Sequence, residues 1–191
     1  MKFNFFSYKI ITLILVLFLN GCANIPSHVI VAPDIMFTPS ISHNNKQTQL
    51  DVIDMRTANH IIQIMREGEA ATLISAQEEL EDTIKNNLGK HWQKQDLVIN
   101  GSAINMIKLS IEKAVISVSQ ETMEYKVQTE IVLKVTVKNG VQTLTSTFKN
   151  SGNSDGPFQA DIAVLERNFN QRLATLLQQI LVNKKISNFL K

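Results

Sequence analysis

Residues 123–149 decide the fold, and they read MEYKVQTEIVLKVTVKNGVQTLTSTFK. Between Tyr125 and Val137, apolar side chains alternate with polar or charged ones, with Val132 as the exception. A period of two residues is typical of a β-strand that buries one face. The Asn139-Gly140 pair that follows favours a two-residue type I′ turn. The stretch therefore predicts an antiparallel hairpin.

The returning strand of this hairpin covers Val141–Lys149. A two-residue loop at the predicted turn would place Val135 opposite Leu144, and Ile131 opposite Phe148, all on one face. The other face carries lysine, glutamate and threonine side chains. We therefore expect one face of the sheet to meet water and the other to cover a core.

Three further segments predict strands. Asn105–Ser119 is rich in β-branched residues, and its apolar parity changes near Lys113, where a β-bulge would restore the inward face. Gln47–Arg56 has the partly alternating pattern of a first strand. Two short apolar stretches within 61–74 flank a polar segment around Gly68, which indicates a small hairpin.

Two segments predict helices. Ser75–Gln93 begins with Ser75 and Glu78, the spacing of a capping box, in which each side chain bonds a free backbone N–H of the first turn. Asp161–Leu181 carries apolar residues at steps of three and four, which keeps them on one face. Between the last strand and this helix, the polar, glycine-containing segment Asn150–Pro157 predicts a loop.

These segments together predict an α+β fold, with a mostly antiparallel sheet in β-α-β-β-β-α order and two helices packed on its apolar face. We divide the chain into a signal segment over 1–21, an acylated N-terminus and extended tether over 22–46, and a single α+β domain over 47–191.

The tether is largely polar, and its prolines at 26, 33 and 39 disfavour a helix. Two apolar islands, Val29–Val31 and Ile35–Phe37, interrupt it. They leave two arrangements open. The segment either extends and holds the domain away from a membrane, or folds back so that the islands lie against the domain.

The N-terminus has the composition of an export signal. Lys2 and Lys9 provide positive charge, and Ile10–Leu19 is an apolar run interrupted only by Thr12. Ten such residues are too few for a comfortable membrane span. The following Leu19-Asn20-Gly21-Cys22 is similar to a lipobox, in which the thiol takes up a diacylglyceryl group. We therefore expect cleavage before Cys22 and acylation of that cysteine.

Cys22 is the only cysteine, so no intrachain disulfide can form, and acylation explains an unpaired thiol in an exported protein. Two or more acyl chains hold a protein stably on a membrane. Ala23 follows in place of the aspartate that retains such proteins at the inner membrane, which favours the outer membrane with the domain facing the periplasm. Without Lys2 and Lys9 the chain is formally neutral, which gives no electrostatic case for nucleic acid.

No catalytic or metal-binding pattern stands out. The four histidines show no paired ligand spacing, and His91 belongs to the end of a predicted helix. Gly152-Asn153-Ser154-Asp155-Gly156 matches the nucleophile-elbow pattern as text, but no histidine follows it, as that triad order requires. We interpret this segment as a polar turn, and we expect no enzyme activity, no cofactor and no metal.

Two clusters are candidate binding residues. Asp54, Arg56 and Thr57 end the first strand with an acid, a guanidinium and a hydroxyl. Arg56 could hold a planar acceptor through two parallel hydrogen bonds, or it could form a local salt bridge and cap a turn. Phe158 and Gln159 precede the last helix, where Phe158 could pack against the helix entry or contact a ligand, and Asp161 is the expected N-cap.

These same residues carry a resemblance to the YajG-type bacterial lipoprotein family. The likeness covers the mature chain in order, through the lipobox, Val31-Ala32-Pro33, Asp54-x-Arg56-Thr57, Gly156-x-Phe158-Gln159-Ala160 and the terminal helix with 186–190. The resemblance implies an envelope lipoprotein with an α+β domain, and it brings no enzymatic mechanism.

The first functional hypothesis is a non-enzymatic, membrane-anchored lipoprotein that binds an envelope protein or the cell wall, with a free strand edge or the solvated sheet face as docking surface. The alternative resembles lipopolysaccharide-assembly lipoproteins, which pair such a domain with an outer-membrane channel. A basic patch of Lys126, Lys134, Lys138 and Lys149 would favour that alternative, because it could meet an anionic glycolipid.

Overall fold

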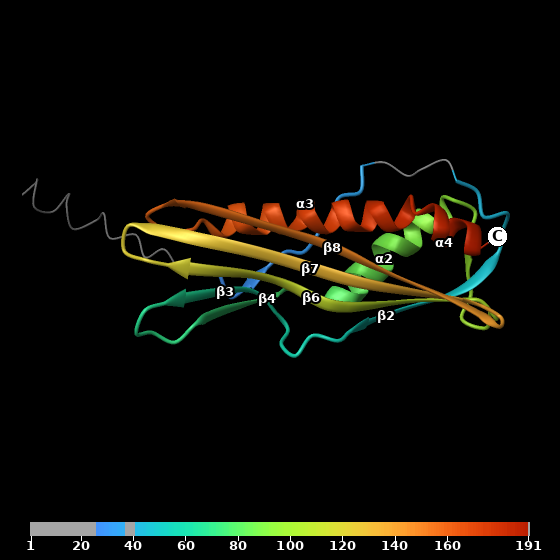
Figure 1. The fold of residues 1–191 in the computed structure, drawn as a ribbon, viewed down its shortest axis with the longest axis horizontal. Helices are drawn as coiled ribbons and strands as arrows, with labels where there is room; N and C mark the ends of the chain where they lie inside the picture. Colours follow the sequence, from blue (N-terminus) through green and yellow to red (C-terminus); the bar gives the residue numbers. More distant parts are fainter. Residues whose placement is uncertain (1–25, 37–40, 191) are drawn as a thin grey trace, which may run out of the picture.

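The computed structural model describes residues 26–36 and 41–190. It is an elongated α+β domain in which a long twisted sheet carries helices on one side (Figure 1). The elements are β1 (His28–Val29), β2 (Gln47–Asp54), β3 (His60–Arg66), β4 (Thr72–Ala76), α2 (Leu80–Gln93), β5 (Val98–Ile99), β6 (Met106–Gln120), β7 (Glu124–Asn139), β8 (Gln142–Pro157), α3 (Ile162–Leu181) and α4 (Lys184–Phe189).

The sheet is organised around β6. The strand β7 lies antiparallel to it over almost its whole length, and β8 lies antiparallel to β7. On the other edge of β6, the strands β2 and β3 lie end to end, both parallel to it. Beyond them β4 is antiparallel to β3, β1 is parallel to β4, and β5 is parallel to β2.

The expectation of a mostly antiparallel sheet is therefore wrong, although the α+β class is confirmed. Of the seven strand pairings in the described part of the chain, four are parallel, and the sheet is mixed. The reason lies in the connection over 55–59. It does not reverse the chain direction, so β2 and β3 follow one another along the same edge of β6 instead of pairing with each other.

The predicted bulge in β6 is present. Its register against β7 shifts between Ile111 and Lys113. Ile107, Leu109 and Ile111 before it, and Ala114, Ile116 and Val118 after it, are all at most 1% exposed. One extra residue thus keeps both halves of the strand facing the core. The largest core side chains from the helices are Trp92 and Phe169, each 1% exposed.

The hairpin β7–β8 forms, but its register differs from the prediction by two residues. The loop is Gly140-Val141, and Gly140 has φ of +60° at the first loop position, as in a type II′ turn. The observed pairs are Asn139–Gln142, Val137–Leu144 and Leu133–Phe148, in place of Val135–Leu144 and Ile131–Phe148. A shift of two residues leaves every side chain on the same face of the sheet, so the hydrophobic pattern alone does not distinguish the two registers.

The predicted start of the first helix is wrong. Ser75 belongs to β4, where it lies opposite His60 of β3 and His28 of β1. The helix α2 begins at Leu80, with Glu79 at the N-cap position and no side-chain cap. Pairing with two neighbouring strands outweighs the local capping signal of Ser75 and Glu78, because it satisfies the backbone on both sides of the segment.

The predicted loop over Asn150–Pro157 is also wrong, because β8 continues through it to Pro157 along β7. Its two glycines leave room for side chains that cross the strand. A Cβ on Gly152 would lie 2.1 Å from the guanidinium of Arg172, and one on Gly156 would lie 2.6 Å from the hydroxyl of Tyr125. The Gly-x-Ser-x-Gly pattern is thus part of an edge strand, and the glycines accommodate covering side chains.

The second helix is confirmed as α3. Asp161 is its N-cap, and its carboxylate accepts a hydrogen bond of 2.8 Å from the backbone N–H of Ala163. One face of α3, with Phe169 and Leu173 at its centre, is buried against the sheet. The short helix α4 follows, capped by Asn183.

Residues 26–36 lie against the domain, which is the second of the two arrangements left open for the tether. Val29 is 1% exposed, and Ile35 is 7% exposed. The backbone N–H of Ile30 donates to Glu166, and that of Ala32 donates to Asn170, both at 2.9 Å. The signal segment and Cys22 lie outside the described residues. Within the described ranges, no helix has the length and hydropathy needed to cross a bilayer.

Candidate functional site

The structure places Arg56 at the junction between the end of β2 and the start of β3. Its side chain is 7% exposed and forms a two-pronged salt bridge with Asp54, which is 17% exposed. The Nε and Nη2 atoms donate to the two carboxylate oxygens at 2.6–3.0 Å. Nη1 donates to the carbonyl oxygens of His60 and Ala114, and Nη2 also reaches the carbonyl of Asn59.

This arrangement uses all five N–H donors of the guanidinium. Arg56 lies where β2 ends and β3 has not yet begun, opposite the bulge of β6, so it bonds backbone carbonyls that neither strand can reach. The neighbouring Thr57 is exposed. The geometry supports a structural role for Arg56, because no donor remains for a ligand.

The second cluster lies at the end of the sheet. Phe158 is 66% exposed and has φ of +64°, a backbone conformation that non-glycine residues rarely adopt. Its side chain therefore does not pack against the helix entry, and the buried Ala160 takes that place. Gln159 is exposed next to it. The structure does not bring this cluster together with Arg56.

Gln120, the last residue of β6, holds Phe158 in this conformation. Its side-chain amide donates to the carbonyl oxygen of Phe158 and accepts from the backbone N–H of Ala160 at 3.3 Å. The backbone N–H of Phe158 also donates to the carbonyl oxygen of Met123 at 2.9 Å. The exposed aromatic ring thus stands on a well-bonded backbone. Sequence reasoning missed Gln120, because nothing local marks a glutamine whose partners lie about forty residues away.

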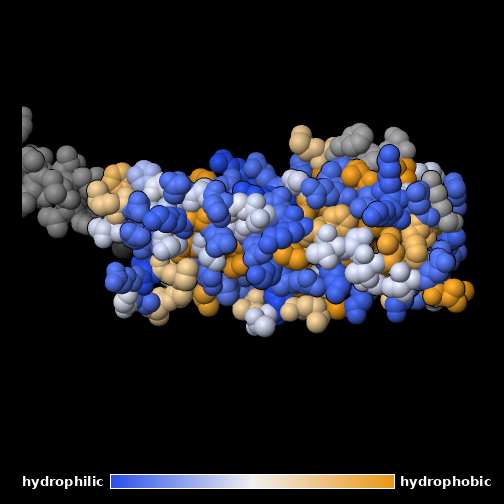
Figure 2. Space-filling model, in the orientation of Figure 1, coloured by the Kyte–Doolittle hydropathy of each residue, from blue (hydrophilic) through white to orange (hydrophobic). Residues whose placement is uncertain are grey.

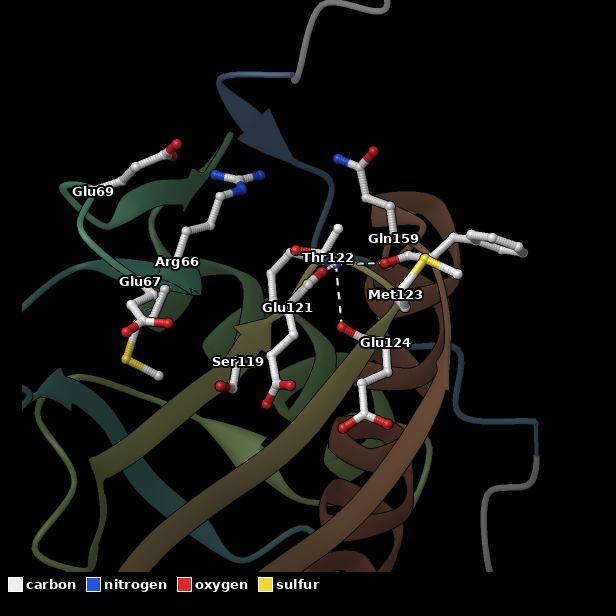
Figure 3. A pocket seen from close by; sticks show the side chains of 12 residues that line it. Arg66, Glu67, Glu69, Ser119, Glu121, Thr122, Met123, Glu124 and Gln159 are labelled. Carbon is white, nitrogen blue, oxygen red and sulfur yellow. Dashed lines mark hydrogen bonds between the residues drawn. The ribbon is translucent and has the colours of Figure 1, made fainter.

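An open basin lies beside Phe158, between the turn that joins β3 to β4 and the turn that joins β6 to β7 (Figure 3). Its lining combines exposed methionines with acidic side chains: Met65, Met123, Glu67, Glu69, Glu121 and Glu124. Lys126 lies 3.0 Å from Glu124 and 3.9 Å from Glu121. The hydrogen bond from Lys126 to Glu124 raises the pKa of this lysine.

The outer face of the sheet carries crossing ion pairs. Glu130 on β7 accepts from Lys113 of β6 at 2.8 Å and lies 2.7 Å from Lys149 of β8. These two lysines hold the pKa of Glu130 below its ordinary value. Lys134 lies 3.8 Å from Glu112. Most of the visible face is hydrophilic, with hydrophobic atoms in small groups (Figure 2). Three of the four lysines in the predicted patch thus have carboxylate partners.

The outer edge of β8 is the third candidate region. In an antiparallel pair of strands, hydrogen-bonded residue pairs alternate with non-bonded pairs. The pair that closes a two-residue loop, here Asn139–Gln142, is hydrogen-bonded. The even-numbered residues of β8 therefore bond β7, and the odd-numbered residues turn their backbone groups away from it. Within the described residues, β8 pairs with β7 only. The carbonyl of Ser151 accepts from Arg172 at 3.3 Å. Among residues 26–36 and 41–190, the outward groups over 143–149 have no such partner.

A polar groove runs between this edge and α3. Its lining side chains are Asn150, Asn168, Gln171, Arg172 and Thr175. Arg172 donates to the side-chain oxygen of Asn150 at 2.8 Å, which fixes its guanidinium across the strand. The edge and the groove together offer backbone and amide hydrogen-bonding groups to an extended segment.

The described residues contain no group of three or more His, Cys, Asp or Glu side chains placed to hold a metal ion. Burial lowers the pKa of His91, nearby Lys94 lowers it further, and Asp34 opposes both. These observations identify no catalytic arrangement, and the lack of enzyme activity stays a prediction.

The chain matches a family of lipoproteins. The family model Lipoprotein_16, described as uncharacterized lipoprotein, matches residues 33–191, and the chain belongs to this family. The match confirms the YajG-type resemblance, and it supports association with the cell envelope. No curated protein sequence matches the chain.

Two solved structures align with this chain at low sequence identity. Protein XCC0632 from Xanthomonas campestris, assigned to DUF330, aligns with a TM-score of 0.57 at 11% identity, over 83% of this chain and 95% of its own. The rare lipoprotein B from Shewanella oneidensis aligns with a TM-score of 0.38 at 11% identity, over 74% of this chain and 98% of its own. The first of these likenesses supports the fold.

Proposed function

We propose that the chain is a non-enzymatic lipoprotein of the outer membrane, anchored through acylated Cys22, which binds an extended segment of an envelope protein along the outer edge of β8. The observation that carries this proposal is the unpaired stretch over 143–149 within a 16-residue edge strand. An unprotected edge of this length is a template for strand addition, and proteins usually block such edges.

Two features indicate where the segment would lie. Arg172 occupies the edge at Ser151, so addition is confined to the part of β8 nearer the β7–β8 turn. In that part the outward residues are Thr143, Thr145, Thr147 and Lys149, and the lysine is directed toward Glu130. The remaining edge is uncharged, which suits an uncharged, β-branched partner strand because cross-strand threonine pairs are favourable.

The alternative role, binding of anionic glycolipid in lipopolysaccharide assembly, has less support. It depended on a basic patch on the outer face, and Lys126, Lys134 and Lys149 have carboxylate partners there. A neutralised lysine attracts a phosphate weakly, because the net local charge is near zero. Lys138 alone of the four has no carboxylate partner within the described chain.

The edge is tested with Thr145→Pro. Proline lacks the backbone N–H that a partner strand would bond, while β7 does not use that N–H, so the domain stays folded. We expect crosslinking of the native protein in whole cells to lose its protein partner in this variant, and to keep it in the matched control Thr145→Val. An unchanged partner in Thr145→Pro would exclude the edge, and recovery of glycan in place of protein would favour the cell wall.

The anchor is tested separately with Cys22→Ser. Without the thiol no acyl group can be attached, and two or more chains are needed for stable membrane binding. We expect the variant protein to leave the membrane fraction after a high-salt wash. Its full retention there would show that the anchor lies elsewhere in the chain.

A further inference from the structure

The first described residues run beside α3 in the same direction. Ile30 bonds Glu166, and Ala32 bonds Asn170, so two residues of extended chain advance as far as four residues of helix. Those advances match, at about 6.6 Å for the strand and about 6 Å for the helix. Continued backward by the same steps, this relation places His28 level with Ile162, the first residue of α3, which follows Phe158 by four residues.

Cys22 precedes Pro26 by four residues. Four residues of fully extended chain span at most about 14 Å. If Cys22 carries the acyl chains, as the proposed function states, the lipid surface lies within that distance of Pro26. The end of the domain that carries Phe158 is therefore the end next to the membrane, and the β7–β8 turn lies at the opposite end (Figure 1).

This membrane-side end presents large apolar side chains to solvent, among them Met65 of the basin, which is 43% exposed. Met123 is 67% exposed and Phe158 is 66% exposed, and the backbone of Phe158 donates to the carbonyl of Met123. The side chain of Gln120 bonds the backbone at Phe158 and Ala160, where Phe158 has its positive φ. The opposite end also exposes apolar residues, Val141 at 100% and Ile104 at 86%, so exposure alone does not distinguish the two ends.

We propose that Met123 and Phe158 rest in the boundary between lipid headgroups and acyl chains, as a second contact beside acylated Cys22. This inference rests on the acyl anchor of the proposed function. The short connection selects this end over the other, because a connection of at most about 14 Å keeps the apolar side chains of the nearer end close to the bilayer. The β8 edge over 143–149 then lies in the part of the domain nearer the β7–β8 turn, away from the lipid.

The charges at this end determine which lipid suits it. Four carboxylates, Glu67, Glu69, Glu121 and Glu124, stand around the basin against the cations Arg66 and Lys126. An excess of negative charge is repelled by anionic headgroups, and salt screens that repulsion. The contact should therefore be closer on zwitterionic lipid than on anionic lipid. A contact made by basic residues would show the opposite order.

The test uses the full acylated chain in vesicles of dibrominated phosphatidylcholine, with a tryptophan introduced by Phe158→Trp. Bromine quenches indole fluorescence at short range, and Trp92, which is 1% exposed, provides a background measured in the unsubstituted chain. The matched control is Val141→Trp, fully exposed at the other end of β7, a strand of 16 residues that spans about 50 Å.

We expect emission from the Phe158→Trp variant to fall about twofold, since interfacial apolar groups lie about 5–10 Å deep in the boundary region. Emission from the Val141→Trp variant should not be quenched, so it should be the same in brominated vesicles as in vesicles without bromine. Addition of anionic phosphatidylglycerol should reduce the quenching at position 158, and salt should restore it.

Equal quenching at both positions, or none at position 158 in a chain that sediments with the vesicles, would overturn the contact and leave the anchor intact. Failure of the chain to sediment with vesicles would overturn the anchor and this inference with it. Loss of the protein partner in the Thr145→Pro variant concerns the β8 edge, and it is independent of either result.

Discussion

The clusters around Arg56 and Phe158 both looked like binding residues in the sequence, and the structure separates them. The side chain of Arg56 is 7% exposed, and oxygen atoms of the same protein chain accept hydrogen bonds from all five of its N–H donors. Phe158 is 66% exposed, and only its backbone is bonded. The difference teaches that a polar cluster at a strand end can serve the strand, whereas an apolar side chain held outward is available for contact with something outside the chain.

The largest expected effect separates the two regions most sharply. Arg56→Ala removes the guanidinium from three backbone carbonyls and from the Asp54 carboxylate, which keeps only the backbone N–H of residue 56, so we expect a loss of about 3 kcal/mol in the free energy of unfolding. For a domain of this size that corresponds to a melting temperature lower by about 10 °C. Urea unfolding monitored by circular dichroism measures it.

Two variants control this prediction. Arg56→Lys keeps the charge but cannot form the two-pronged pair and the carbonyl bonds together, so it should remain well below the parent stability. Arg167→Ala removes an exposed arginine of α3 and should change little. A stable Arg56→Ala protein that has lost its envelope partner would reverse the comparison and make Arg56 a binding residue.

The next effect concerns the support of Phe158. Gln120→Ala removes the side-chain bonds to the carbonyl of Phe158 and the N–H of Ala160, and we expect a loss of about 1–2 kcal/mol. The loss should be confined to the end of the domain, with faster amide hydrogen exchange at 158–160. The control Gln128→Ala removes an exposed glutamine of β7. Equal exchange rates in the two variants would show that Gln120 does not position this segment.

A smaller effect comes from the outer face, which neither cluster uses. Glu130→Gln should lower stability by less than about 1 kcal/mol at neutral pH, since Lys113 and Lys149 are largely solvated. Because the folded pKa of Glu130 is lowered, its contribution is present above the pKa of an unfolded glutamate, about 4.3, and is lost as the pH falls through the folded value. Parent and variant stabilities should therefore converge once the pH has fallen below the folded pKa of Glu130; a constant gap would contradict the assignment.

The smallest effect is expected at Phe158 itself. Phe158→Gly removes a side chain that the core does not use and relieves a positive φ, while glycine costs backbone entropy, so stability should stay within about 1 kcal/mol of the parent. The same variant should lose the lipid contact proposed above. A large loss of stability would mean that the ring has a structural role, and the contrast with Arg56 would disappear.

Local patterns predicted much of this fold correctly. The period of β7, the parity change at the bulge of β6 and the cap of α3 at Asp161 depend on neighbours within a few residues, and each is present. The predictions that failed involve competition between local and distant partners. Ser75 pairs with two neighbouring strands and does not cap a helix, and residues 150–157 pair with β7 and do not form a loop.

Of the candidate site, the sequence marked Arg56 and Phe158 but could not assign their roles. Whether a guanidinium is saturated depends on the carbonyl of Ala114, which lies 58 residues away. Whether Phe158 is covered depends on Gln120, 38 residues away. The groove beside β8 was beyond prediction, because it exists only where α3 passes the edge.

The sequence by itself determined the α+β class, the faces of the long strands and helices, and the family to which the chain belongs. The class and the faces follow from the hydrophobic period, which each segment carries alone, and the family follows from motifs that occur in order along the chain. Only the tertiary structure decided the mixed sheet, the burial of Arg56, the outward position of Phe158 and the free edge of β8. These features depend on which segments become neighbours. Many strand pairings satisfy the same hydrophobic pattern, and only the hydrogen bonds of the backbone and of buried charged groups select one of them.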